Sequence, residues 1–279
     1  MKITSTSNPR IQAALRALES GERMLLEGVR AIGEALAAGI VPEEIFLEGE
    51  ERTGGEGSVP AIEQATEHGA SLCFVTSKVL SKLSDLPSAR GVVALAVPPR
   101  RSLPDLYLSK NLPSVPVPHS SASSTSSSSN SLFVLLDGVQ DPANVGAIVR
   151  SAEAFGAAGV VLTPDCASPF SPKAVRASAL SALRVPLATG VTPRAAVAWA
   201  DGLGASLAGA EARGGDPPAS ISGLRPLVLV IGSEGRGISA VLESRLDRRV
   251  TIPLAGQVES LNASVAAGVL LALISGRAL

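Results

Sequence analysis

The chain has 279 residues; 46% of them are hydrophobic, 3% are aromatic, and the formal net charge is −1. This composition supplies apolar surface for roughly two domains of about 100–200 residues, and it excludes a globally basic nucleic-acid binder. The two cysteines and the two histidines are isolated from one another, so we expect neither a disulfide scaffold nor a metal. The polar first residues and the lack of an apolar run of roughly 20 residues indicate a cytoplasmic protein without a membrane partner.

Helix-like and strand-like patterns alternate over residues 1–103. The first helix has Asn8 as its expected N-cap, Pro9 at its first position and Gly21 just after its end. Helices are predicted at 8–21, 29–39, 60–69 and 76–84, and strands at 24–28, 43–49, 70–75 and 91–98. This alternation predicts a small α/β domain.

A segment of very different composition follows. Residues 113–131, PSVPVPHSSASSTSSSSNS, are rich in proline and then in serine, and they carry almost no charge. Such a sequence cannot bury enough apolar surface to offset the entropy of ordering it. Residues 104–131 are therefore predicted to be a flexible linker.

The α/β pattern starts again at residue 132 and continues to residue 279. The strands LFVLL and LVLVI are apolar throughout, which is typical of parallel strands that are covered on both faces. Strands are predicted at 132–138, 159–163, 184–188, 204–210, 226–232 and 248–254, and helices at 141–157, 171–183, 192–202, 238–246 and after Asn262. We expect a second α/β domain with a parallel sheet over residues 132–279.

Three stretches of this second domain place polar residues where a strand ends and a helix begins, which is where open α/β sheets bind ligands. The first is LDGVQDPANVGAIVRSAEAFGA, whose helix carries Asn144 in its first turn. Arg150 lies about 100° around this helix from the apolar position Val149. Asn144 and Arg150 are well separated around the helix, so we do not expect one small ligand to contact both from this helix alone. Taken alone, Arg150 is more simply interpreted as a solvated arginine.

The second stretch, LVLVIGSEGRGIS, places three glycines between a strand and a helix. Gly232, Gly235 and Gly237 allow backbone N–H groups to approach a ligand closely. Their spacing matches neither the dinucleotide-binding fingerprint nor the phosphate-binding P-loop, so an ordinary glycine-rich turn with an exposed Glu234 is equally consistent with it. A Rossmann-type oxidoreductase is disfavoured for the same reason.

The third stretch, VTIPLAGQVESLNASVAAGVLL, joins a strand to the apolar closing helix. Its loop exposes backbone that can bind a flat, uncharged ring system. Ser260 and Asn262 can point from this loop toward a reacting centre. A plainer interpretation makes Ser260 the N-cap of the helix.

Together and in this order, DPANVGAIVRSAEAFGA, LVIGSEGRGIS and IPLAGQVESLNASVAAG closely resemble the three signature motifs of the SpoU, or TrmH, branch of the SPOUT RNA methyltransferases. The resemblance covers residues 132–279. The intervening SPKAVRASA is also similar, but Leu180 follows it where relatives often carry glycine. At the N-terminus, ITSTSNPRIQAALRAL and MLLEGVRAIGEALAAG resemble the substrate-recognition domain of rRNA-methylating members, with Gln12 where relatives commonly have lysine.

The resemblance implies a fold, an activity and partners. The fold is an α/β methyltransferase domain with a parallel sheet and a deep trefoil knot at its C-terminal end, preceded by a small α/β substrate-binding domain. The activity is methyl transfer from S-adenosylmethionine to a ribose 2′-hydroxyl of RNA, without a metal. Large-subunit (23S) rRNA is the expected substrate; a tRNA, or a non-catalytic RNA-binding role on the same fold, are the alternatives. The protein is expected to be a homodimer through the methyltransferase domain, which would let Asn144 and Arg150 serve different sites.

The resemblance also assigns residues. Arg150 stands at the position of the family's proposed catalytic arginine, and because a guanidinium resists deprotonation, a stabilising role is favoured over that of a base. Asn144 would orient the ribose or Arg150, Glu234 would fix the glycine-rich loop, and Ser260 and Asn262 would complete the site. The cofactor is expected to contact Ile231, Gly232, Gly237, Ile252, Leu254 and Leu261. Phosphates of the RNA are expected to contact Arg10, Arg23, Arg30, Lys173 and Arg176, with Arg16 as a further candidate.

Overall fold

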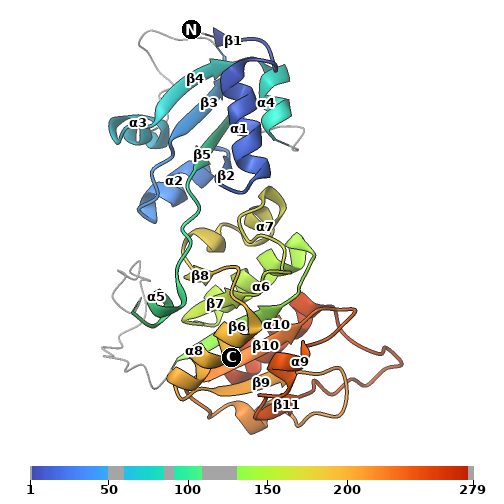
Figure 1. Cartoon of the computed structure of the whole chain (residues 1–279). Coiled ribbons are helices and arrows are strands. Elements are labelled where there is room, and N and C mark those ends of the chain that lie inside the picture. Colours follow the sequence, from blue (N-terminus) through green and yellow to red (C-terminus); the bar gives the residue numbers. More distant parts are fainter. Residues whose placement is uncertain (1, 50–59, 85–90, 109–130, 276–279) are drawn as a thin grey trace. The chain divides into compact units, whose positions relative to one another are not determined.

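The computed structural model describes residues 2–49, 60–84, 91–108 and 131–275. The chain divides into two compact units, drawn in Figure 1: Met1–Pro99 with Phe170–Arg176, and Arg100–Pro169 with Ala177–Leu279. Most of the predicted linker, 104–131, lies outside the described residues. Its first residues differ from the prediction, because Leu103–Leu108 form a helix (α5) of the second unit in which Leu106 is buried.

The first unit is built on a five-stranded mixed sheet. The strands are β1 (Lys2–Ile3), β2 (Met24–Glu27), β3 (Glu44–Glu48), β4 (Ser71–Val75) and β5 (Val92–Ala96). They lie in the order β1-β4-β3-β5-β2, and β5 is antiparallel to both of its neighbours. The two-residue strand β1 was not predicted, whereas the other four confirm the predicted strands.

The described residues of this unit include four helices, and all four were predicted. They are α1 (Pro9–Glu19), α2 (Val29–Ala37), α3 (Pro60–Glu67) and α4 (Ser77–Leu83). The start of α1 is the expected one, because the Asn8 side chain accepts a hydrogen bond from the Arg10 amide at 2.9 Å. One core of this unit joins α1 and α4 to the strands through Ile11, Val79 and Phe46, all fully buried. The apolar side chains of these short helices face the core, so packing stabilises the helices in addition to their intrinsic helix propensity.

The second unit contains a sheet of six parallel strands, as predicted. The strands are β6 (Leu132–Asp137), β7 (Gly159–Leu162), β8 (Leu187–Ala188), β9 (Ser206–Ala210), β10 (Leu227–Gly232) and β11 (Arg248–Val250). They lie in the order β11-β9-β10-β6-β7-β8, and every neighbouring pair is parallel. All residues of β6 are buried, because helices cover both faces of the sheet.

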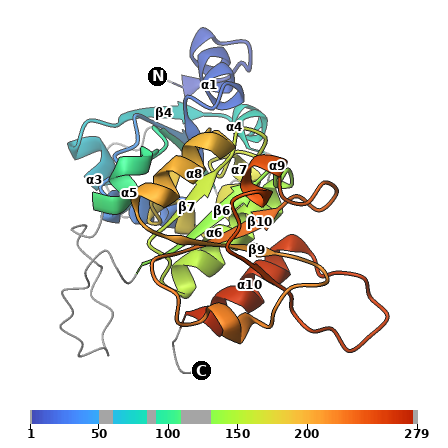
Figure 2. The same ribbon diagram turned by 60° about the horizontal axis from the view of Figure 1, so that its bottom comes forward.

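The helices of the second unit form two groups on the two faces of this sheet (Figure 2). They are α5, α6 (Pro142–Ala154), α8 (Pro193–Gly202), α9 (Ala240–Glu243) and α10 (Ala263–Ile274), while α7 (Pro172–Ala177) falls largely in the segment that clusters with the first unit. α5, α8 and α9 share one core with the strands, in which Phe133 and Trp199 meet edge to face at 5.0 Å. α6 and α10 pack together on the opposite face. The deep trefoil knot stays a prediction.

The predicted helix over 171–183 is wrong in its second half. α7 ends at Ala177, and the chain turns at Ala179 and Leu180, whose φ angles are +48° and +70°. A short 3-10 helix, Ser181–Leu183, follows. A positive φ is unfavourable for a residue with a Cβ atom, so glycine would fit the position of Leu180 with less strain.

Three element ends also differ from the predictions. β11 stops at Val250, so residues 251–254 are loop rather than strand, and α9 is limited to Ala240–Glu243. The N-cap of α10 is Asn262, not Ser260, because the Asn262 Oδ1 accepts hydrogen bonds from the amides of Ser264 at 2.9 Å and Val265 at 3.4 Å. Across the described ranges, no helix combines the length and apolar character that crossing a membrane requires.

Candidate functional site

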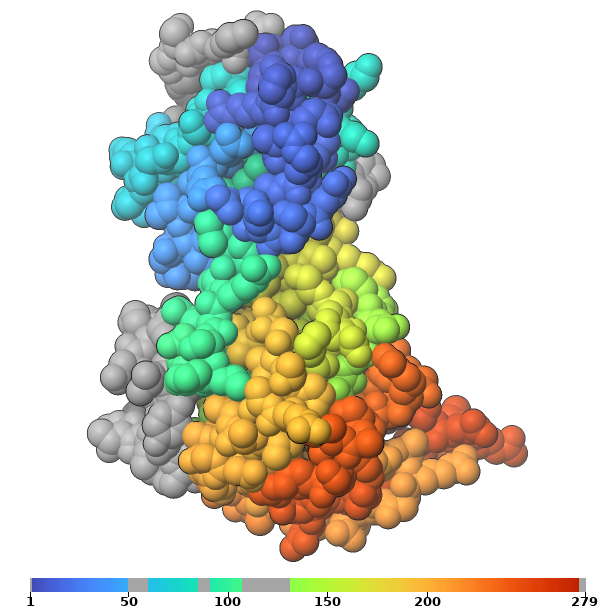
Figure 3. Space-filling view, viewed as in Figure 1, coloured from blue at the N-terminus to red at the C-terminus, as the bar shows by residue number. Residues whose placement is uncertain are grey.

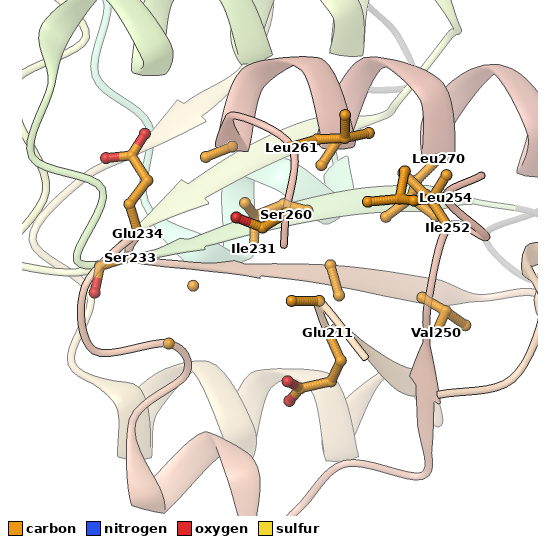
Figure 4. A pocket seen from close by; sticks show the side chains of 16 residues that line it. Glu211, Ile231, Ser233, Glu234, Val250, Ile252, Leu254, Ser260, Leu261 and Leu270 are labelled. Atoms are coloured by element: carbon orange, nitrogen blue, oxygen red, sulfur yellow. The ribbon is translucent and has the colours of Figure 1, made fainter. Parts of the chain in front are cut away.

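A cavity of about 240 Å³ lies at the carboxyl ends of β9, β10 and β11, next to the start of α10 (Figure 4). Carboxyl ends of parallel strands meet at one edge of a sheet, so three loops that are distant in sequence line the same space. The lining residues are Ala210, Glu211 and Ala212 after β9; Ile231, Gly232, Ser233, Glu234 and Gly237 at β10; Val250, Ile252 and Leu254 at β11; and Ser260, Leu261, Ala263, Ala266 and Leu270 at α10. The red-orange chain before α10 projects from the surface of this unit in Figure 3.

All six residues that were expected to contact a cofactor lie in the lining of this one cavity: Ile231, Gly232, Gly237, Ile252, Leu254 and Leu261. Their role stays a prediction. The lining after β9 was missed, because the polar, glycine-containing sequence EARGGD that follows this strand was not one of the three stretches singled out from the sequence. Only the position of β9 between β11 and β10 brings it to the site.

The glycine-rich loop after β10 closes tightly on itself. The Ser233 amide donates to the Gly237 carbonyl at 3.0 Å, and the Gly237 amide donates back to the Ser233 carbonyl at 2.9 Å. A Cβ atom on Gly232 would lie 2.4 Å from the carbonyl carbon of Gly237, and Gly237 itself has a φ of +67°. Gly232 and Gly237 are therefore required by the turn, whereas a side chain on Gly235 would meet open space.

Beside the cavity, three polar side chains from three separate segments form a hydrogen-bonded cluster. The Nδ2 of buried Asn144 donates to Oε1 of Glu234. The Nδ2 of Asn262 donates to Oδ1 of Asn144 at 3.1 Å and lies 3.5 Å from Oε1 of Glu234. Since the Oδ1 of Asn262 also caps α10, one carboxamide both ends the loop and holds the cluster. We call this set the Asn144–Glu234–Asn262 cluster.

The other two residues with predicted catalytic roles lie outside this cluster. Ser260 lines the cavity, but its hydroxyl forms no hydrogen bond with the described part of the chain. Arg150 is exposed on α6, six residues after Asn144, and it does not line the cavity. Within the described ranges Arg150 forms neither a hydrogen bond nor an ion pair. Its guanidinium is therefore available to a group outside the described residues.

Glu211, one of the two carboxylates that line the cavity, has a raised pKa. Burial raises the pKa of Glu211, the nearby carboxylate of Glu243 raises it further, and Arg249 offsets the change in part. Arg249 itself donates two hydrogen bonds to Oε1 of Glu243, from its Nε and Nη2 atoms. The positive charge of Arg249 is therefore paired mainly with Glu243. The Glu211 carboxylate has no hydrogen-bond partner among the residues described.

The basic residues expected to contact RNA have mostly internal partners. Nε of Arg10 binds Glu44 at 2.7 Å, and Nε of Arg23 binds Glu43 at 2.5 Å. Within the first unit, Arg176 binds Glu27 at 2.7 Å. The side chain of Arg30 is 78% exposed and lies 4.0 Å from Glu34, and Lys173 is exposed. An RNA phosphate would have to compete with a carboxylate for the three paired arginines.

A metal site would need a group of His, Cys, Asp or Glu side chains close together. Over the described ranges, no three or more His, Cys, Asp or Glu side chains are grouped so that they could hold a metal ion. The cavity and the cluster together offer apolar contact, hydrogen bonds and two carboxylates.

The sequence is similar to RNA-modifying proteins over nearly its whole length. The profile of the SpoU rRNA Methylase family matches residues 131–272, and that of the MRM3-like substrate binding domain matches residues 16–94. An uncharacterized tRNA/rRNA methyltransferase of Mycobacterium sp. (strain KMS) is 34% identical over 265 residues, which cover 93% of this chain and 78% of that protein.

Solved structures agree with this similarity. The AdoMet-bound rRNA methyltransferase of Sinorhizobium meliloti superposes with a TM-score of 0.79 at 25% identity, covering 98% of this chain and 97% of that one. An RNA 2′-O ribose methyltransferase superposes with a TM-score of 0.72 at 28% identity, covering 98% of both chains. The fold is that of an RNA methyltransferase. The chain belongs to the SpoU rRNA Methylase family, which excludes the Rossmann-type oxidoreductase alternative.

Proposed function

We propose that this methyltransferase transfers the methyl group of S-adenosylmethionine to a ribose 2′-hydroxyl of RNA, and that the RNA is large-subunit (23S) rRNA. The observation that carries the proposal is the cavity at the carboxyl edge of the parallel sheet, which adjoins the Asn144–Glu234–Asn262 cluster. The solved relatives described as AdoMet-bound and as a 2′-O ribose methyltransferase support the cofactor and the reacting hydroxyl.

The residues of the cavity fit S-adenosylmethionine. Figure 4 shows Ile252, Leu254 and Leu270 gathered at one end, which suits the flat adenine, and Glu234 at the other. Small residues, Gly232 and Gly237 among them, leave backbone exposed for hydrogen bonds to the ring. When bound, the cofactor supplies an electrophilic methyl group, so the protein needs no metal to activate the donor.

The harder task for the protein is to activate the hydroxyl, because an alcohol is a poor nucleophile until it loses its proton. The guanidinium of Arg150 is exposed and has no partner in the part of the chain that the structure describes. We assign it the role of stabilising the negative charge that develops on the 2′-oxygen. The Asn144–Glu234–Asn262 cluster positions the ribose and holds the loop after β10. Ser260, with an unpartnered hydroxyl in the lining, completes the hydrogen bonds to the reacting groups.

The separation of Arg150 from the cavity supports a site that is shared between two copies of the chain. α6, which carries Arg150, packs against α10. Val265 and Leu273 of α10 each have 51% of their surface exposed and lie about 80° apart around the helix, and Val258 in the preceding loop is 61% exposed. We propose that this apolar surface forms a homodimer interface through the methyltransferase domain, so that Arg150 serves the partner's site.

The experiment that tests the function is methylation of RNA from cells that lack this protein. Purified protein and methyl-labelled S-adenosylmethionine are incubated with total RNA and with ribosomal particles, and nucleosides are identified by mass spectrometry. A labelled 2′-O-methylnucleoside in large-subunit rRNA, absent with Arg150→Ala, is the expected result. Label in tRNA alone supports the tRNA alternative. No label and no cofactor binding would leave the non-catalytic RNA-binding role.

A further inference from the structure

Glu211 is the cavity carboxylate for which the proposed mechanism has no use. It follows directly after β9, and its amide donates to the Val250 carbonyl at 2.8 Å, which fixes its backbone beside β11. Its side chain lines the cavity, and in Figure 4 it lies on the side opposite Leu261 and away from Glu234. Glu234, the other carboxylate of the lining, is already bound to Asn144 and Asn262.

The surroundings of Glu211 leave its charge without a dedicated partner. The charged groups that face it are Glu243 from α9 and Arg249 from β11, and these two bind each other. Within the described ranges, the Glu211 carboxylate forms no hydrogen bond and no ion pair. A partly buried carboxylate without a partner is unfavourable, and such groups are common where a ligand supplies the missing donors.

The chemical structure of the proposed cofactor indicates which hydrogen-bond donors could pair with the Glu211 carboxylate. Its adenine suits the apolar lining near Ile252 and Leu254, and its methyl group must reach the Asn144–Glu234–Asn262 cluster. The ribose lies between these two parts of the molecule and carries two adjacent hydroxyls. Two adjacent O–H donors match the two oxygens of one carboxylate, as in the pairing of acidic residues with ribose at dinucleotide sites.

We propose that Glu211 binds the cofactor's ribose by accepting hydrogen bonds from its 2′- and 3′-hydroxyls, and so makes the cavity specific for a ribonucleoside. The inference rests on the proposed function, since it assumes S-adenosylmethionine in this cavity. It assigns Glu211 to binding rather than to the methyl-transfer step itself.

Equilibrium binding by titration calorimetry tests the proposal without turnover. The ligands are S-adenosylmethionine, S-adenosylhomocysteine and the 2′,3′-dideoxy analogue of the latter. The proteins are wild type, Glu211→Gln, and Glu67→Gln, which makes the same chemical change at an exposed residue of α3. For Glu211→Gln we expect about tenfold weaker binding of both natural ligands, as for the loss of a charge-assisted hydrogen bond. The dideoxy analogue should bind wild type about tenfold more weakly, with little further loss in Glu211→Gln.

The outcomes separate this inference from the proposed function. Equal affinity of wild type and Glu211→Gln for S-adenosylhomocysteine overturns the ribose contact. A loss confined to S-adenosylmethionine overturns it as well, because it assigns the carboxylate to the sulfonium charge. If wild type binds neither natural ligand, the proposed function fails and the inference fails with it. Unfolding curves for Glu211→Gln exclude a folding defect as the cause of weaker binding.

The pH dependence of binding provides a second measurement. Burial and Glu243 raise the pKa of Glu211 in the free protein, and hydrogen bonds to the ribose require the ionised carboxylate. The affinity of wild type for S-adenosylhomocysteine should therefore fall as the pH is lowered through this raised pKa. The affinity of Glu211→Gln should not follow the same fall, so the ratio of the two should narrow at low pH. A ratio that is independent of pH contradicts the contact.

Discussion

The two units of the chain use their charged side chains differently. In the first unit, Arg10, Arg23 and Arg176 each bind a glutamate, and the residues form part of the folded structure. In the second unit, two charged groups with proposed roles, Arg150 and Glu211, have no partner within the described ranges. The sequence pattern alone did not distinguish these two situations.

The second unit is not simply poor in ion pairs. Arg184 binds Glu153, Arg245 binds Asp201, and Arg249 binds Glu243. Within one unit, therefore, some charged side chains form ion pairs, while Glu211 in the cavity lining and Arg150 on α6 have no partner among the described residues. A charged residue is therefore a candidate for ligand contact when the fold leaves it without a partner.

Among the variants, Arg150→Ala should cause the largest loss of methyl-transfer activity. Removal of a stabilising donor from a developing oxyanion costs about 10²- to 10³-fold in rate. Because Arg150 is exposed and contacts no charged or hydrogen-bonding group among the residues described, the melting temperature and the Kd for S-adenosylhomocysteine should stay unchanged. Initial rates of methyl transfer to RNA measure the effect, and Arg194→Ala, an exposed arginine of α8, is the control. A rate within a few-fold of wild type would mean that Arg150 is only a solvated arginine.

Variants of Asn262 distinguish its role as the N-cap of α10 from its role in the Asn144–Glu234–Asn262 cluster. Asn262→Asp keeps a good N-cap for α10 but removes the donor to Asn144 and places a second carboxylate beside Glu234. We expect about 10²-fold lower methyl-transfer rates, as for a small misplacement of reacting groups, with the helix retained. Asn262→Ala should in addition lower the free energy of unfolding by about 1 kcal/mol.

The matched control for Asn262→Asp is Asn8→Asp, the same change at the N-cap of α1. It should leave both the rate and the stability near wild type, because Asn8 lies in no cluster of the site. Equal rates for Asn262→Asp and wild type would contradict the positioning role of the Asn144–Glu234–Asn262 cluster.

Local signals explain which parts of the fold were predictable. Asp141 and Pro142 mark the start of α6 in the sequence, and Asp141 accepts a hydrogen bond from the Ala143 amide as a cap does. The break after α7 has no such signal, because Ala179 and Leu180 adopt positive φ without being glycine or asparagine. The interpretation of Ser260 as the cap of α10 was wrong, since serine and asparagine both cap helices and only the course of the preceding loop decides that Asn262 is the cap.

Local sequence signals also explain which parts of the site were predictable. The glycine-rich loop and the closing helix were found from motifs, and all six residues expected to contact the cofactor line one cavity. Glu211 was missed because its loop carries no motif, and strand order places it at the cavity. The pairing of Arg10 and Arg23 with Glu44 and Glu43 was missed because it depends on contacts between distant segments.

Glu153 provides a test of a paired charge in the second unit. The Arg184 guanidinium binds both of its oxygens, at 2.6 and 2.9 Å, and this hydrogen bonding lowers the pKa of Glu153 despite its partial burial. A lowered carboxyl pKa adds stability that is complete above the unfolded value of about 4.3 and is lost as the pH falls through the folded value. Glu153→Gln should therefore lower the free energy of unfolding by about 0.5–1 kcal/mol at pH 7.

In urea unfolding curves, the difference between Glu153→Gln and wild type should be smaller at a pH below the unfolded value than at pH 7, because the contribution of the ion pair is lost as the pH falls through the lowered pKa of folded Glu153. Glu67→Gln, exposed and unpaired, should show no difference at either pH. A destabilisation by Glu153→Gln that is independent of pH would mean that packing, and not the ion pair, is responsible.

The smallest expected effects concern RNA binding by the first unit. Lys78 and Lys82 of α4 are exposed and have no partner within the described ranges, and both lie within the part that matches a substrate-binding domain. If unpaired cations are the ones that bind phosphates, Lys78→Gln with Lys82→Gln should weaken RNA binding a few-fold. It should also reduce the slope of log affinity against log salt by about 1 for each phosphate that the variant no longer neutralises.

Arg10→Gln is the matched comparison, since Arg10 already binds Glu44. A phosphate that recruits this guanidinium must separate it from the carboxylate, so the net gain from binding the phosphate is small, and affinity should change less than about twofold. Fluorescence anisotropy with a labelled rRNA fragment at several salt concentrations measures both variants. A steeper loss of affinity and salt slope for Arg10→Gln than for the lysine variants would show that RNA opens the internal ion pairs. The pairing seen in the first unit would then describe its free state, and the arginines chosen from sequence would be the ones that bind RNA.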